Sequence, residues 1–131
     1  MLINEWQYEL TIWIWLGIAA GTFLLLMFVR APYGRHERPG WGPRIPARLG
    51  WVFMESPCIV VMTVFFGIGV SGWNLADPVG IIFYILWTGH YIHRSWVWPA
   101  RARITGKKMP ISLILFAVGF NGINAWINAE W

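Results

Sequence analysis

The chain has 131 residues, of which 57% are hydrophobic and 12% charged, and its mean hydropathy is +0.52. Soluble chains are about 45–50% apolar and about 25% charged, so this composition excludes an ordinary soluble domain and indicates a membrane protein. The net charge of +4 does not indicate nucleic acid as a partner, because the cations lie in short loops between long apolar runs. The lone cysteine, Cys58, excludes an internal disulfide. We expect no metal site.

Four apolar segments predict an all-α, polytopic membrane bundle that forms one transmembrane domain over residues 1–131. The predicted helices span about 10–29, 49–73, 79–98 and 111–131. The first segment lies between Glu9 and Arg30 and carries no charge, and its length of about 30 Å as a helix matches a bilayer core. Gly17 and Gly21 on this helix form a small-xxx-small pair suited to close helix packing. No ten-residue stretch alternates apolar and polar residues, so a membrane barrel is not predicted.

The ten Lys and Arg residues all fall in or next to two connections, one after the first predicted helix and one around the end of the third. They are Arg30, Arg35, Arg38, Arg44, Arg48, Arg94, Arg101, Arg103, Lys107 and Lys108. Most acidic residues fall on the opposite side, namely Glu5, Glu9, Asp77 and Glu130. The positive-inside rule therefore predicts cytoplasmic basic loops and an outside or lumenal N-terminus, in a bacterial inner membrane or the endoplasmic reticulum.

Ionisable residues enter the predicted helices on that same basic side. Glu55 lies near the start of the second helix, where a charge at mid-bilayer costs about 2.5–3.5 kcal/mol on insertion scales. On the third helix, spacings of three and four place several polar and aromatic residues on one face: Trp87, His90, Tyr91, Arg94 and Trp98. Topology thus predicts that Glu55, His90, Tyr91 and Arg94 lie at a similar depth, and such a cluster is a candidate functional site.

Structural explanations compete with a functional one. Glu55 and Arg94 could form a buried ion pair that serves the fold alone. On the fourth helix, Asn124 and Asn128 share a face with Asn121, and Asn121 is better explained as an interhelical hydrogen bond than as a ligand contact.

An ordered set of motifs then resembles the steroid 5α-reductase (3-oxo-5α-steroid 4-dehydrogenase) family, from residue 33 to the end of the chain. The matching stretches are Tyr33–His36, Pro46–Pro57, His90–Arg94, Met109–Pro110 and Asn124. The resemblance implies a seven-helix membrane enzyme that uses NADPH to reduce the carbon–carbon double bond of an α,β-unsaturated ketone. Members of the family are about twice as long, so this chain resembles their N-terminal half.

The resemblance also implies roles for single residues. Glu55 and Tyr91 match the catalytic pair that holds the substrate carbonyl. The implied cofactor-binding residues are Arg94, Tyr33, Trp51 and Arg35, and the implied substrate-binding residues are Met54, His90 and Asn124. Met54 stands where animal steroid reductases carry Gln, which leaves the substrate open between a steroid and another apolar lipid. The alternatives are a truncated, non-catalytic membrane module and a related reductase of enoyl thioesters or polyprenols.

Overall fold

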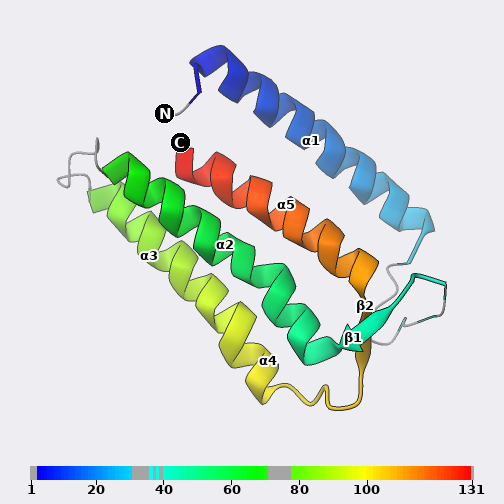
Figure 1. Ribbon diagram of the computed structural model, residues 1–131. Helices are drawn as coiled ribbons and strands as arrows, with labels where there is room; N and C mark the ends of the chain where they lie inside the picture. The colour runs from blue at the N-terminus through cyan, green and yellow to red at the C-terminus, as the bar shows by residue number, and fades with distance from the viewer. Residues whose placement is uncertain (1–2, 31–35, 37, 39, 71–77, 131) are drawn as a thin grey trace.

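The computed structural model describes residues 3–30, 36, 38, 40–70 and 78–130 (Figure 1). The elements follow in the order α1 (Glu5–Phe28), β1 (Arg44–Pro46), α2 (Ala47–Val70), α3 (Pro78–Ile92), the π-helical turn η2 (His93–Val97), α4 (Trp98–Arg101), β2 (Lys108–Pro110) and α5 (Ile111–Glu130). The helices form a bundle, which confirms the predicted fold class. α1, residues Ala47–Ile68 of α2, and α5 are each long and apolar enough to cross a membrane.

Helix α1 begins at Glu5, five residues before the predicted start. A capping box explains the earlier start: the Asn4 side chain accepts a hydrogen bond from the backbone N–H of Gln7, and the Gln7 side chain accepts one from the backbone N–H of Asn4. The predicted start was placed where the uncharged run begins. The helix starts earlier because a cap satisfies its first backbone N–H groups whatever the hydropathy of the residues there.

Helices α2 and α5 pack side by side at the centre of the bundle (Figure 1). Fully buried Met62 of α2 fits against Ala125 and Ala129 of α5, two small residues four apart that let the helices approach closely. The small-xxx-small pair predicted on α1 is not used in this way. A Cβ added at Gly17 or Gly21 would meet nothing within 4 Å, so that prediction was wrong for the described bundle.

The third helical run extends without a gap from Pro78 to Arg101. Within it, the α-helical geometry changes to a π-helical turn at η2. The regular α-helix α3 therefore covers only 15 residues, fewer than the other three long helices. A π turn inserts one extra residue and rotates the remainder of the helix about its axis, and such turns occur frequently at functional sites. Here η2 carries Arg94 and the buried Ser95.

A two-stranded ribbon ties the two basic connections together, and the all-helical prediction did not include it. β1 runs antiparallel to β2 with Ile45 opposite Met109. The ribbon is extended by the backbone N–H of Ala47, which donates to the carbonyl of Lys107 at 2.9 Å. Buried Ala47, Met109 and Ile114 form a small core where the ribbon meets α2 and α5.

The charges of the described residues separate towards the two ends of the bundle. The end of α4, at the bottom of Figure 1, and the ribbon and the start of α2, to its right, lie at one end of the bundle. The basic residues of these segments and of the loop between α4 and β2 are Arg44, Arg48, Arg101, Arg103, Lys107 and Lys108. The start of α1 and the end of α5 lie at the other end, with Glu5, Glu9 and Glu130. Asp77 and Arg35 lie outside the described residues.

Candidate active site

A cavity of about 970 Å³ lies between α1, α2, α5 and the run that joins α3 to η2. Most of its walls are apolar, including Leu26 of α1 and Phe116 of α5. The polar side chains that line it are Thr22, Glu55, His90, Tyr91, Arg94 and Asn121. A largely apolar cavity with a few converging polar groups is the usual form of a small-molecule site.

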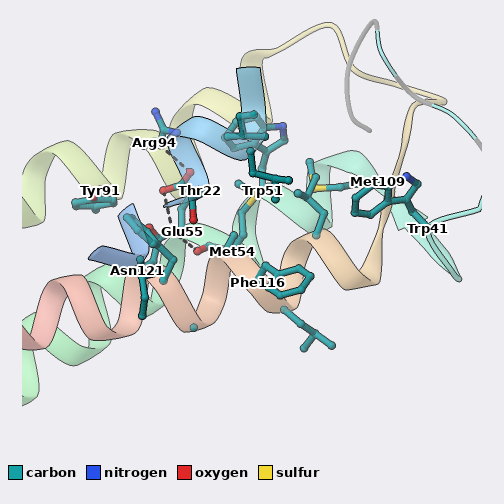
Figure 2. A pocket seen from close by; sticks show the side chains of 18 of the residues that line it. Thr22, Trp41, Trp51, Met54, Glu55, Tyr91, Arg94, Met109, Phe116 and Asn121 are labelled. Carbon is teal, nitrogen blue, oxygen red and sulfur yellow. Dashed lines mark hydrogen bonds and ion pairs between the residues drawn. The ribbon is translucent and has the colours of Figure 1, made fainter. Parts of the chain in front are cut away.

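Glu55 is the buried charge of this cavity, with 2% of its surface exposed. Its Oε1 lies 2.7 Å from Nε of Arg94, and its Oε2 accepts a long hydrogen bond of 3.5 Å from Nδ2 of Asn121 (Figure 2). An isolated carboxylate is costly to bury, and a partner on each oxygen offsets part of that cost. The ion pair foreseen as a structural alternative therefore forms, and it forms in the wall of the cavity.

Arg94 reaches from η2 to Glu55 and also faces open space. Its side chain is 46% exposed, and its guanidinium carbon lies 5.5 Å from the ring centre of Trp51. Trp51 in turn meets Trp98 edge to face at 4.8 Å. Arg94 thus combines an ion pair, a cation–π contact and an exposed surface at one edge of the cavity.

Tyr91 lies one helical turn before Arg94 in sequence. Its ring is 5.0 Å from that of Trp87 and 5.1 Å from that of His90. Among the described residues, the direct polar partners of Glu55 are Arg94 and Asn121. Tyr91 lines the same cavity without bonding the carboxylate.

The structure brings most of the residues predicted from sequence together. Glu55, Tyr91, Arg94, Trp51, Met54 and His90 all line the one cavity. Asn124 is not among the lining residues, and its carbonyl instead accepts a 2.8 Å hydrogen bond from Asn128 on the same helix. Tyr33 and Arg35 lie outside the described residues.

Asn121 forms the predicted interhelical hydrogen bond, because its Nδ2 donates to the backbone carbonyl of Met54 at 2.6 Å. Its place in the cavity wall beside Glu55 was not predicted from the sequence. Its spacing of three from Asn124 was a usable signal, because it indicates a polar strip on α5. The contribution of α1 to the cavity, through residues such as Trp15 and Thr22, had no comparable signal in an uncharged helix.

Apolar helices that line an open cavity with a buried, ion-paired carboxylate define a multi-pass membrane protein with a polar site in its bundle. No family model matches the chain. Steroid 5-alpha-reductase DET2 of Gossypium hirsutum is 38% identical over 117 residues, which are 87% of this chain and 44% of the relative. 3-oxo-5-alpha-steroid 4-dehydrogenase 2 of Rattus norvegicus is 33% identical over 105 residues, 76% of this chain and 39% of the relative.

The chain belongs to the steroid 5α-reductase family, as its motifs indicated. DET2 of Arabidopsis thaliana gives the same result, with 35% identity over 84% of this chain and 43% of the relative. The chain spans less than half the length of these three relatives, which agrees with the expected partial match.

Proposed function

We propose that this chain provides the substrate-carbonyl part of a membrane reductase. The reaction is NADPH-dependent reduction of the carbon–carbon double bond of an α,β-unsaturated ketone, such as a 3-oxo-4-ene steroid. One observation carries the proposal: Glu55, Tyr91 and Arg94 converge on a single apolar cavity inside a bundle of membrane helices. The names of the relatives, which are steroid reductases or dehydrogenases, support it.

The roles of Glu55 and Tyr91 follow from what each side chain can donate. Both oxygens of Glu55 already accept from Arg94 and Asn121, so Glu55 acts as a fixed acceptor. Tyr91 has a hydroxyl to donate, and we assign it the hydrogen bond to the substrate carbonyl oxygen. Negative charge grows on that oxygen as the β-carbon is reduced, and a donor fixed in a dry site stabilises this charge. Glu55 supports this role by holding the positively charged Arg94 guanidinium in the wall of the same cavity.

The residues at the edge of the cavity suit an anionic dinucleotide. Arg94 uses Nε for Glu55 and keeps 46% of its side chain exposed, and a guanidinium is well matched to phosphate oxygens. The indole of Trp51 beside it offers a flat apolar surface for a ring of the cofactor. When bound, NADPH supplies the hydride for the β-carbon. Arg94 and Trp51 would hold the cofactor, and Met54 and His90 would contact the substrate.

The separation of charge along the bundle supports an orientation for the two ligands. With the basic end on the cytoplasmic side, as the positive-inside rule predicts, a charged cofactor reaches Arg94 from water. An apolar enone partitions into the bilayer and reaches the cavity from there, where the apolar walls favour it.

The experiment is turnover by the chain reconstituted in liposomes with NADPH and a 4-en-3-one steroid, with detection by mass spectrometry of a product two hydrogens heavier. Tyr91→Phe and Glu55→Gln should each reduce the rate by at least about tenfold, since loss of one oxyanion donor typically costs about 10²–10³. Tyr84→Phe is the matched control: Tyr84 lies on the same helix but bonds Thr63, away from the cavity.

The outcomes separate the alternatives. Full activity in both Tyr91→Phe and Glu55→Gln would overturn the assigned roles. Enone binding without turnover would assign the chain to a non-catalytic module. Turnover of an enoyl thioester or a polyprenol but not of the steroid would move the proposal to a different lipid substrate.

A further inference from the structure

The turn of α2 that carries Glu55 is held by one residue of α5. Nδ2 of Asn121 donates to the backbone carbonyl of Met54 at 2.6 Å and to Oε2 of Glu55 at 3.5 Å (Figure 2). The backbone carbonyl of Asn121 accepts from Sγ of Cys58 at 3.7 Å. Three contacts thus join one residue of α5 to three residues within two turns of α2.

We propose that Asn121 is a positioning residue that fixes the carboxylate of Glu55 for its role with Tyr91, an inference that rests on the proposed function. The carboxylate has two oxygens, and each is assigned to a different helical element. Arg94 holds Oε1 from η2, and Asn121 holds Oε2 from α5. With both oxygens held, the carboxylate plane has a single orientation in the cavity wall.

Pro57 lies in this part of α2 and weakens its helical hydrogen bonding. A proline inside a helix has no N–H to donate, so the bond to the carbonyl four residues earlier, at Phe53, is missing. The backbone next to such a break is easily displaced, and in a membrane its carbonyls must find other partners. Asn121 donates to the adjacent carbonyl, that of Met54, which directly precedes Glu55.

A comparison along α5 separates this role from general helix packing. Asn128 has the same side chain on the same helix, but its amide donates to the backbone of its own helix at Asn124, 2.8 Å away. Asn121 lines the cavity and reaches another helix, whereas Asn128 does neither. Asn128→Leu is therefore a control for placing leucine on the polar strip of α5.

The test compares Asn121→Leu with Asn128→Leu in the purified chain in detergent, using two measurements. The first is the infrared carboxylate band of Glu55, isolated by subtracting the spectrum of Glu55→Gln. The second is the dissociation constant of a 4-en-3-one steroid. We expect Asn121→Leu to shift the band and weaken steroid binding about tenfold, while Asn128→Leu leaves both unchanged.

The two measurements distinguish a failure of the positioning role of Asn121 from a failure of the proposed function. An unshifted Glu55 band in folded Asn121→Leu would overturn the positioning role, whatever the steroid does. A shifted band in a chain whose wild type binds no steroid would contradict the proposed function and leave the positioning of Glu55 intact. A tenfold loss of binding in Asn128→Leu as well would show a packing effect of α5 and also overturn the proposal.

A second measurement covers the case in which Asn121→Leu does not fold. The side-chain amide resonances of Asn121 can be followed by NMR in the wild-type chain and in Glu55→Gln, which leaves Asn121 and its bond to Met54 in place. Removing the negative charge should move the Asn121 amide signals and leave those of Asn128 in place. Unmoved Asn121 signals would overturn the proposal.

Discussion

At the scale of single residues, the site depends on the buried carboxylate of Glu55, whose ion-pair partner Arg94 is about half exposed. Glu55 is 2% exposed, while the Arg94 side chain is 46% exposed. Such a pair contributes little net stability, because desolvation of the carboxylate offsets the attraction. Removing Arg94 is costly, because it leaves the buried charge of Glu55 with only the amide of Asn121 as a partner.

We therefore predict that Arg94→Met destabilises the chain by up to about 3 kcal/mol, the lower end of the range for a broken buried pair, because Arg94 is partly solvated. Unfolding by denaturant in detergent measures the loss. Arg101→Met, which removes an exposed cation from α4, should change the free energy of unfolding by less than about 0.5 kcal/mol. The double variant Glu55→Gln/Arg94→Met should recover most of the loss, and additive losses would contradict the pairing.

The sequence predicted Glu55, Tyr91 and Arg94 as neighbours because helix order and charge fix the depth of each residue. It did not predict that Asn121 bonds Glu55. That contact depends on the rotation of α5 about its axis, which is set by the close packing of Ala125 and Ala129 against Met62.

At the scale of elements, the ribbon and the start of α2 are packed tightly around Gly50. A Cβ added at Gly50 would lie 2.9 Å from Sδ of Met109 and 3.2 Å from Cδ1 of Ile114. Met109 is 2% exposed and has little room to move. The glycine thus allows β2 and α5 to lie against the first turn of α2.

Gly50→Ala should accordingly destabilise the chain by about 1–3 kcal/mol, as overpacking of a core does, despite the better helix propensity of alanine. Gly122→Ala is the matched control on α5, since an added Cβ there meets nothing within 4 Å. Thermal unfolding in detergent should show a lower midpoint for the first variant and an equal or higher one for the second. A Gly50→Ala chain as stable as the wild type would contradict tight packing, because it would show that the ribbon shifts to accommodate the added methyl group.

The four long helical runs could be predicted because an apolar stretch of about twenty residues has few alternatives in a bilayer. The ribbon could not, because strands of three residues are too short to show an alternating pattern. The π turn η2 could not be predicted either, because it adds one residue to a helix that remains continuous and leaves the hydropathy pattern unchanged. It does change which helix face the residues after Arg94 occupy, and so it matters to the site.

At the scale of the whole molecule, the cavity lies towards the end of the bundle where the basic residues gather. We predict that this end faces the cytoplasm. Because the chain has one cysteine, fully buried Cys58, single introduced cysteines can report the orientation with little background. An impermeant maleimide applied to intact bacteria should label Trp6→Cys and spare Lys107→Cys until the cells are broken. The opposite pattern would reverse the orientation.

The most direct test of the central claim is an ultraviolet titration of the purified chain with a 4-en-3-one steroid. The absorption of an enone moves to longer wavelength when its carbonyl accepts a strong hydrogen bond, so the spectrum reports the contact without turnover. The account predicts a saturable red shift in the wild type and in Tyr84→Phe. It also predicts loss of the shift in Tyr91→Phe, with affinity reduced by about tenfold or less, the value of one neutral hydrogen bond. No shift in the wild type, or an equal shift in Tyr91→Phe, would contradict it.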